Sequence, residues 1–223
     1  LIGSITHAFK GDPAIVAMGV REVAYLCDAA NRYFREQIAP VDVLRTISAA
    51  NSVIAPARRH RSDGAASLDF GRGKAPLLTM FGGDVTTARW RAERAVSKFT
   101  RFHPMTPRWT ATAPLPGGEF AWQRFETEVD IARDHWRFLS EAQARRLVAA
   151  YGLNVKDVLG DAKAKADLGP AFGAELTGAE VRYLMQKEWA RFPDDILWRR
   201  SKLGLTMPQA DRDALAAFMT KPD

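Results

Sequence analysis

The residues best placed to do chemistry lie around a Gly-Gly turn. An apolar run over residues 75–81 ends at Gly82 and Gly83, and Asp84 then precedes Thr86 and Thr87 at the start of a helical pattern. Glycines at such a strand–turn–helix junction let the backbone approach a ligand, and the free amides of the helix start attract an anion. The alternative is a tight turn with Asp84 as the N-cap, and spacing alone favours it.

Other sites of catalysis or metal binding find little support in the residue spacing. No two histidines stand three or four residues apart, and the single cysteine is Cys27, so no metal-ligand pattern forms. The sequence has no nucleophile elbow, no P-loop and no G-x-G-x-x-G. We therefore expect no metal centre, and nothing in the chain that would hold a dinucleotide phosphate by itself.

The net positive charge of the chain suggests nucleic-acid binding, but the distribution of the basic residues argues against it. The formal net charge is +6, but the basic residues are spread along the chain among acidic ones. The densest basic run, residues 58–61, is short and lies in a loop-like stretch. We expect a solvated loop there, with an anionic lipid or a phosphorylated substrate as the alternative, and no nucleic-acid binding.

Three further features of the sequence concern the cellular compartment, contact with a membrane and the start of the chain. Cys27 lies in an amphipathic pattern, which favours an inert buried thiol over a reactive one and fits a reducing cytoplasm. No apolar run approaches the roughly 20 residues needed to cross a bilayer, so membrane contact would be peripheral. Residues 1–6 read as an apolar strand without an initiator Met. We therefore expect the sequence to begin inside a longer protein.

The elements that must position the turn belong to a mixed first part. Apolar residues at helical spacing predict an amphipathic helix over residues 20–37, and residues 41–47 read as a short strand. Residues 55–73 are rich in Pro, Arg, Gly and Ser, which is typical of a loop or hairpin. The pattern predicts a strand over 75–81 and a helix after the Gly-Gly turn.

Four prolines between residues 104 and 116, followed by Gly117 and Gly118, indicate a linker. Beyond it the pattern is helical, with capping signals such as Ser140 and Thr177. The predicted fold class is α+β: the tail of a β-sheet domain (1–105), a linker (106–118) and an all-α domain of five or six short helices (119–223).

Several strings resemble one family in order and spacing. Residues 188–191 read E-W-A-R and residues 194–204 read D-D-I-L-W-R-R-S-K-L-G. Upstream stand F-G-G at 81–83 and A-P-L-P-G-G at 113–118. Together they resemble the FAD-dependent, aerobic glycerol-3-phosphate dehydrogenases over nearly the whole chain. The Trp189 and Trp198 rings of the first two strings lie in amphipathic helical patterns, so we predict that both fill the core.

The resemblance implies a flavoenzyme that moves a hydride from C2 of glycerol 3-phosphate to FAD, gives dihydroxyacetone phosphate and passes electrons to quinone or, in oxidase relatives, to oxygen. It also implies a cytoplasmic protein in peripheral contact with the inner face of the membrane. The ADP half of FAD would be held by an N-terminal region that these residues lack. Within the chain, Gly82, Gly83, Thr86 and Thr87 would lie near the cofactor, and Arg61 would contact the substrate phosphate.

The sequence departs from the family pattern at the site itself. Asn51 stands where the family has an arginine that faces the substrate, and Asp84 where it has the lysine of F-G-G-K. Thr6 and Ala88 replace an Asp and a Tyr, whereas Arg89 is retained. The hypothesis is therefore part of a glycerol-3-phosphate dehydrogenase with eroded catalytic positions. The alternative is an inactive paralogue or fragment whose helical domain mediates association, and in either case we expect this chain alone to be inactive.

Overall fold

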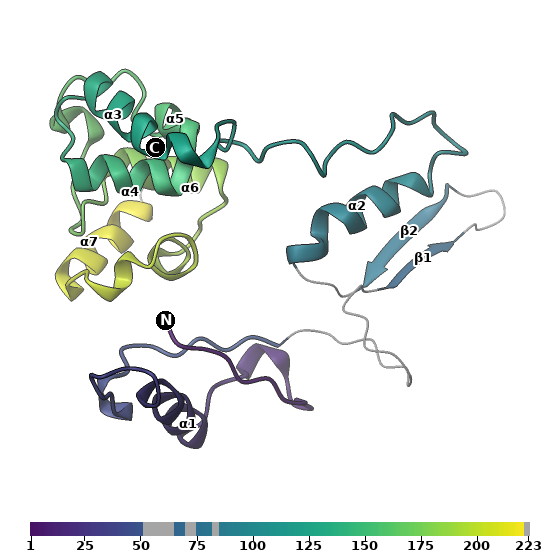
Figure 1. Ribbon diagram of the computed structural model, residues 1–223, viewed down its shortest axis with the longest axis horizontal. Helices are drawn as coiled ribbons and strands as arrows, with labels where there is room; N and C mark the ends of the chain where they lie inside the picture. Colours follow the sequence, from purple (N-terminus) through teal and green to yellow (C-terminus); the bar gives the residue numbers. More distant parts are fainter. Residues whose placement is uncertain (51–64, 70–74, 82–84, 221–223) are drawn as a thin grey trace. The chain divides into compact units, whose positions relative to one another are not determined.

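The computed structural model describes residues 1–50, 65–69, 75–81 and 85–220. For residues 65–69 and Phe81 it describes the backbone only. The chain divides into two compact units, Leu1–Thr112 and Ala113–Asp223. Figure 1 shows strands in the first unit only and a cluster of helices in the second. This is the predicted α+β class, a strand-containing part followed by a helical domain.

The first long element is α1, which spans Val20–Asn31. It begins where the carboxylate of Glu22 accepts a hydrogen bond from the Gly19 amide at 2.5 Å, and it buries Cys27 as predicted. It ends before the predicted limit of residue 37. The reason is Asn31, whose side-chain amide pairs with both backbone groups of Ile38 at 2.9 Å and turns the chain.

Two predicted strands were wrong. Residues 1–6 and 41–47 form no strand, and a short 3-10 helix, η2 (Pro40–Asp42), enters the second segment. The carboxylate of Asp42 accepts from the Ala39 amide at 2.8 Å and stabilises that turn. An extended segment becomes a strand only when a neighbour pairs with its backbone, and among the described residues no segment pairs with either of these.

The strand predicted over residues 75–81 is present, and part of the stretch 55–73, predicted as a loop or hairpin, forms a strand that pairs with it. Strand β1 (Ala65–Asp69) pairs antiparallel with β2 (Leu77–Phe81), with Ala65 opposite Phe81 and Asp69 opposite Leu77. A 3-10 turn, η3 (Val85–Thr87), then leads into α2 (Ala88–Ser97). Strand, turn and helix thus follow one another in the predicted order, as Figure 1 shows.

Every regular element among the described residues of the second unit is a helix, apart from one isolated bridge between Ala171 and Thr177. Ser140 and Thr177 act as the predicted N-caps, since their hydroxyl oxygens accept from the Gln143 amide at 3.1 Å and the Glu180 amide at 3.4 Å. In chain order its helices are η4 (Trp122–Arg124), α3 (Phe125–His135), α4 (Glu141–Tyr151), η5 (Gly152–Asn154), α5 (Val155–Leu159), η6 (Lys165–Leu168), α6 (Gly178–Lys187), a π-helix η7 (Asp195–Arg200), η8 (Leu203–Leu205) and α7 (Gln209–Met219).

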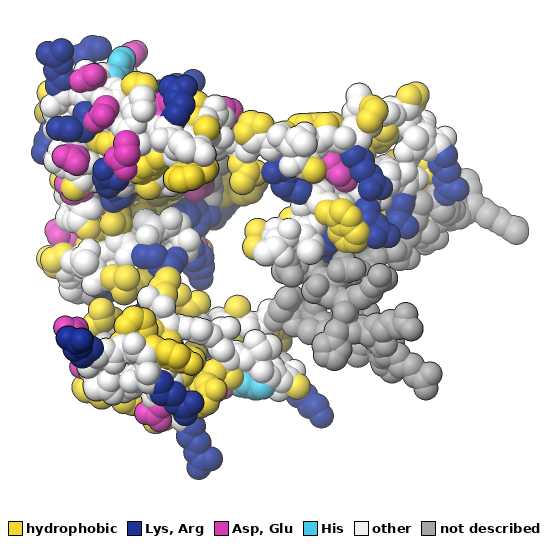
Figure 2. All heavy atoms as spheres, in the orientation of Figure 1, with side chains coloured by type: hydrophobic (Ala, Val, Ile, Leu, Met, Phe, Trp, Pro, Cys, Tyr) yellow, Lys and Arg dark blue, Asp and Glu magenta, His cyan; other side chains and the backbone are white. Residues whose placement is uncertain are grey.

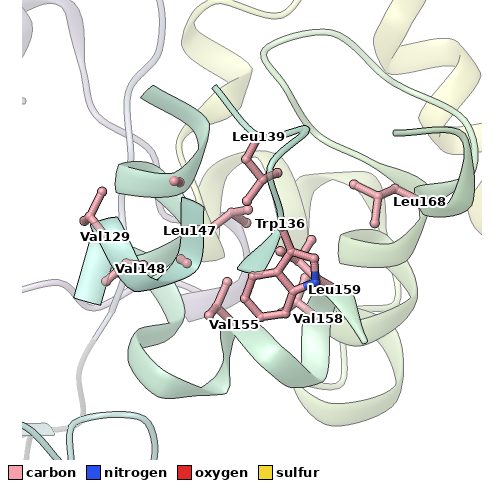
Figure 3. Close-up of a cluster of buried hydrophobic side chains, with 11 residues drawn as sticks. Val129, Trp136, Leu139, Leu147, Val148, Val155, Val158, Leu159 and Leu168 are labelled. Carbon is pink, nitrogen blue, oxygen red and sulfur yellow. The ribbon is translucent and has the colours of Figure 1, made fainter. Parts of the chain in front are cut away.

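Two groups of buried side chains hold this unit together. The first surrounds Trp136, with side chains from α3, α4 and α5 (Figure 3). The indole nitrogen of Trp136 donates to the Gly160 carbonyl at 3.1 Å, so its polar atom is satisfied. The second joins α6, the π-helix and α7 around Leu184, Ile196 and Leu215. In both groups, apolar burial is what stabilises helices too short to persist alone.

The first unit buries far less of its apolar surface. Hydrophobic side chains gather on the surface around α1 (Figure 2), and Tyr33 and Phe34 are 86% and 67% exposed. Among the described residues of this unit only Cys27, Ala30 and Ala95 are buried hydrophobics. No described helix is long and apolar enough to cross a membrane.

Candidate functional site

Most of the predicted site residues lie outside the described part of the chain. The structure describes Thr86 and Thr87, both within η3. The residues that it does not describe are Asn51, Arg61, Gly82, Gly83 and Asp84. Their predicted roles therefore stay predictions.

The junction that would carry the site is described on both of its sides. Strand β2 ends at Phe81 and η3 begins at Val85, so three residues separate the strand end from the turn entering α2. Thr87 is the N-cap residue of α2. The first amides of a helix have no partner within the helix, so an entrance of this kind is suited to an anion. The anion-binding interpretation of the turn depends on residues 82–84, which lie outside the described residues, so it stays a prediction.

Helix α2 itself is strongly basic. It carries Arg89, Arg91 and Arg94 against a single acid, Glu93. The carboxylate of Glu93 accepts hydrogen bonds from the amide and hydroxyl of Thr110, at 2.9 and 2.6 Å, and these bonds lower the pKa of Glu93. Glu93 is thus engaged in holding the segment after α2, and the helix adds positive charge beside the junction.

Two charged side chains of the 188–204 string stabilise the fold. The guanidinium of Arg200 donates to the Glu188 carbonyl through two nitrogens, at 3.1 and 2.5 Å. The carboxylate of Asp195 accepts from the amides of Arg191 and Phe192 at 2.9 and 3.0 Å, and these bonds lower the pKa of Asp195. Arg200 and Asp195 are therefore engaged by backbone groups and stabilise this part of the helical unit.

The end of the string shows why it needs a tryptophan and a glycine. Trp198 is buried, as predicted. A Cβ on Gly204 would lie 2.6 Å from two atoms of the Trp198 ring, so only glycine lets the chain pass the indole. Arg212 covers the ring at 5.7 Å and donates to the Gly204 carbonyl at 2.7 Å. This contact locks the π-helix onto α7.

The prediction that Trp189 fills the core was wrong. Its side chain is 79% exposed, and its backbone adopts a left-handed conformation with φ of 56°. The reason lies in the next residue: the Ala190 amide donates to the Leu184 carbonyl at 3.0 Å, and Ala190 is itself buried. The turn that buries Ala190 directs the indole into solvent, which helical periodicity cannot reveal.

Sequence reasoning also missed a buried charge network between α4 and α6. Glu180 is 1% exposed. Its carboxylate accepts from both terminal nitrogens of Arg146, at 2.8 and 2.7 Å, and from the Tyr151 hydroxyl at 2.8 Å. Burial and the charge of Glu180 together raise the pKa of Tyr151. Local spacing places Glu180 only in the first turn of α6, after the Thr177 cap, whereas its pairing with Arg146 depends on the tertiary structure.

The helical unit has an open aromatic cleft of about 320 Å³ where the linker meets α4. Its walls include Phe120, Phe125, Tyr151 and Tyr183, and Glu188 lies at its edge. Asp157 and Glu188 both contribute negative charge, and burial followed by these charges raises the pKa of Tyr183. The cleft can therefore accept an apolar group accompanied by positive charge. No cluster of potential metal ligands occurs among the residues described.

Comparison with known sequences identifies the family of the chain. The sequence model of a family described as the C-terminal domain of alpha-glycerophosphate oxidase matches residues 108–220, which is half of the chain.

The chain belongs to the FAD-dependent glycerol-3-phosphate dehydrogenase family.

Curated relatives extend the similarity to almost every residue. The chain is 37% identical to a glycerol-3-phosphate dehydrogenase of Pseudomonas aeruginosa, over 98% of its own length and 44% of the relative. It is 38% identical to a D-erythritol 1-phosphate dehydrogenase of Brucella abortus, again over 98% and 44%. The aerobic glycerol-3-phosphate dehydrogenase of Escherichia coli is 37% identical over 99% and 45%. The chain thus spans less than half the length of these relatives.

Family membership agrees with the structural roles found above. The matched region contains the Arg200 and Asp195 contacts, the Gly204–Trp198 packing and the buried Glu180 network. All of these stabilise the helical unit. The predicted substrate and cofactor residues precede residue 108 and lie outside the matched region.

Proposed function

We propose that this chain is the C-terminal part of an FAD-dependent dehydrogenase that oxidises a polyol phosphate, with glycerol 3-phosphate as substrate and dihydroxyacetone phosphate as product. The observation that carries the proposal is the 37% identity with the Pseudomonas aeruginosa enzyme, which extends over 98% of the chain. Electrons would pass to quinone, from a cytoplasmic protein in peripheral contact with the membrane.

In this proposal the chain contributes one side of the cofactor and substrate site. FAD, when bound, accepts the hydride from C2 of the substrate. Gly82 and Gly83 would bring the backbone near it, and Thr86 and Thr87 would offer hydroxyl groups at the α2 entrance. Arg61 would pair with the substrate phosphate. The strand–turn–helix order around the junction supports this placement.

The substitutions at Asn51 and Asp84 favour weak activity. With an effective dielectric constant near 20, a unit charge about 4 Å from an anion contributes roughly 4 kcal/mol, so exchanging lysine for aspartate would change the energy of a bound anion by several kcal/mol. Such a change corresponds to orders of magnitude in binding or rate. The same substitutions support the second candidate function, an inactive paralogue whose helical domain serves in association.

The relatives also suggest a second substrate. The Brucella abortus relative is named for D-erythritol 1-phosphate, and its identity of 38% is close to the 37% of the Pseudomonas aeruginosa glycerol-3-phosphate dehydrogenase. Asn and Asp side chains are good partners for hydroxyl groups, and a longer polyol phosphate offers more of them. D-erythritol 1-phosphate is therefore the alternative substrate to test.

The test uses the longest natural product that contains this chain. The purified protein is assayed for flavin absorbance and for dye reduction with each of the two substrates. The double change Asn51→Arg and Asp84→Lys should raise the rate with glycerol 3-phosphate. The matched control, Ala214→Arg with Asp213→Lys on the exposed face of α7, adds the same charge far along the chain and should leave the rate unchanged.

Each outcome decides between the candidates. A flavin-containing protein that turns over either substrate supports the enzyme. Flavin without turnover, restored by the double change, supports an eroded site. A protein without flavin favours the inactive paralogue. A measurable rate that the double change leaves unaltered or lowers contradicts the placement of Asn51 and Asp84.

A further inference from the structure

We propose that the aromatic cleft of the helical unit binds a small quaternary ammonium compound, an organic cation of the choline type. The cleft has a volume of about 320 Å³ and lies where linker residues 115–118 meet α4. All of its lining residues belong to the helical unit. The inference therefore goes beyond the proposed dehydrogenase function and does not depend on it.

Two tyrosine rings form a corner in the wall of the cleft. The rings of Tyr151, on α4, and Tyr183, on α6, meet at 79° with their centroids 5.4 Å apart. Phe120 adds a third ring to the lining. The faces of aromatic rings attract cations, and several rings around one desolvated ammonium group form the cage that is typical of quaternary ammonium sites. A rounded cation placed in this corner would face both tyrosine rings.

Glu188 gives the cleft a negative charge. It is the only charged residue among those that line the cleft, all of which the structure describes. Arg200 lies 3.8 Å from its carboxylate, but the Arg200 guanidinium donates its hydrogen bonds to the carbonyls of Glu188 and Asp195. Burial raises the pKa of both Tyr151 and Tyr183, and the charge of Glu188 adds to the effect at each. A cation between these rings would therefore be attracted by the Glu188 carboxylate.

The hydrogen-bonding groups of the cleft favour a quaternary over a primary ammonium. The Gly117 carbonyl already accepts from the Leu153 amide at 2.9 Å. The Tyr151 hydroxyl donates to the Glu180 carboxylate at 2.8 Å. A primary ammonium carries three donors that each need an acceptor, whereas a quaternary ammonium carries none. The volume of the cleft is near the lower end of the range for ligand pockets, roughly 300–1,000 Å³, so the ligand is small.

An adjoining hollow competes for the same cation and suits it less well. It shares Phe120 and Phe125 with the cleft and also has an acid, Glu126, in its wall. However, the Glu126 carboxylate accepts from both terminal nitrogens of Arg145, at 2.8 and 2.5 Å. The Arg145 guanidinium also lies 5.6 Å from the centroid of the Phe125 ring. A cation of the protein already engages this acid and this ring, which leaves the cleft beside Glu188 as the site.

The experiment titrates the 223-residue chain with choline in an isothermal titration calorimeter. We expect a dissociation constant of about 1 mM or tighter. The matched ligand is the neutral isostere of choline, in which a tert-butyl group replaces the trimethylammonium group. It has the same shape without the charge, so it should bind at least about tenfold more weakly. Phosphocholine should also bind more weakly than choline, because Glu188 repels its phosphate.

Substitutions in the cleft locate the bound cation. Tyr183→Leu removes a ring but keeps an apolar side chain, whereas Tyr183→Phe keeps the ring, so only the first should weaken choline binding, by about tenfold. Glu188→Gln should weaken it similarly, and Glu126→Gln, in the adjoining hollow, should leave it unchanged. Ala149→Arg places a cation at an exposed position of the cleft wall and should abolish binding. Circular dichroism melts check that each variant stays folded.

Phosphatidylcholine vesicles distinguish a free cation from a lipid head group. They carry the ammonium group beside a phosphate, so they should not displace choline from the chain. Loss of choline binding in their presence would make the lipid head group the ligand and overturn the proposal. The proposal would equally fail if choline did not bind or if the neutral isostere bound as tightly. A cation that Glu126→Gln weakens, and that Glu188→Gln and the folded Ala149→Arg variant still bind, would also contradict it.

Discussion

Gly117 and Gly152 pack backbone against backbone. A Cβ on Gly152 would lie 2.0 Å from the Gly117 carbonyl oxygen, and a Cβ on Gly117 would lie 2.2 Å from the Tyr151 carbonyl oxygen. The Gly117 carbonyl accepts a hydrogen bond from the Leu153 amide at 2.9 Å. The end of the proline-rich segment is therefore anchored on the C-terminus of α4, where it forms one wall of the cleft.

Replacing Gly152 with alanine should destabilise the helical unit strongly. Gly160→Ala is the matched control, because Gly160 has φ of 53° against 56° at Gly152 but nothing within 4 Å of its added Cβ. Both changes carry a backbone cost of about 1–3 kcal/mol, and Gly152→Ala should add about 1–3 kcal/mol for the clash. Denaturant unfolding measures the difference, and equal losses would contradict the close packing.

Truncation of the two tryptophans of the 188–204 string should change the free energy of unfolding by very different amounts. Trp198→Ala removes a buried ring that packs on Gly204 and should cost roughly 3–5 kcal/mol. Trp189→Ala acts on a ring that is 79% exposed and should change the free energy of unfolding by less than about 0.5 kcal/mol. Unfolding should be followed at a concentration where the chain is monomeric. A large loss with Trp189→Ala would refute its exposed position.

The Glu180 network should be far more sensitive than a similar pair on the surface. Glu180→Gln leaves the buried Arg146 charge without its counter-ion, so we expect a loss of about 3–5 kcal/mol. The control is Glu126→Gln, since Glu126 also accepts two hydrogen bonds from one arginine, Arg145, but in solvent. Its unfolding midpoint should barely move. Similar shifts in both variants would mean that burial does not decide the cost.

Stability should fall in acid partly through Asp195. Bonds from the Arg191 and Phe192 amides lower the pKa of Asp195 in the folded state. The stabilisation is therefore complete above the unfolded value of about 3.9 and is lost as pH falls through the lower folded value. Asp195→Asn should flatten the fall below about pH 4, measured by urea unfolding against pH. Arg199→Gln should keep most of the slope, because the backbone bonds are the larger cause.

The 223-residue chain by itself should purify without flavin and should not reduce a dye with glycerol 3-phosphate. The chain has no G-x-G-x-x-G to hold the ADP half of FAD, and it covers only 44% of the Pseudomonas aeruginosa enzyme. Absorbance spectra and a dye assay with added FAD provide the measurement. A yellow, active preparation of this chain would show that it carries a complete site.

The amino-acid sequence alone predicted that the second half of this protein is helical and where several of its helices begin or end. Ser140, Thr177 and Gly152 mark helix ends through local hydrogen bonds and backbone angles, which depend on a few neighbouring residues and can be predicted from them. The buried position of Trp198 followed from the same periodicity. The resemblance of the 188–204 string located the family, although the structure gives that string a stabilising role.

Other features depended on partners distant in the chain. Residues 41–47 have the composition of a strand but lack a paired neighbour among the described residues. Trp189 and Trp198 have the same helical spacing pattern, and only the turn that buries Ala190 decides that one ring faces solvent. Glu180 meets Arg146 across 34 positions of sequence. Periodicity describes a single element, whereas burial is decided by the elements that pack against it.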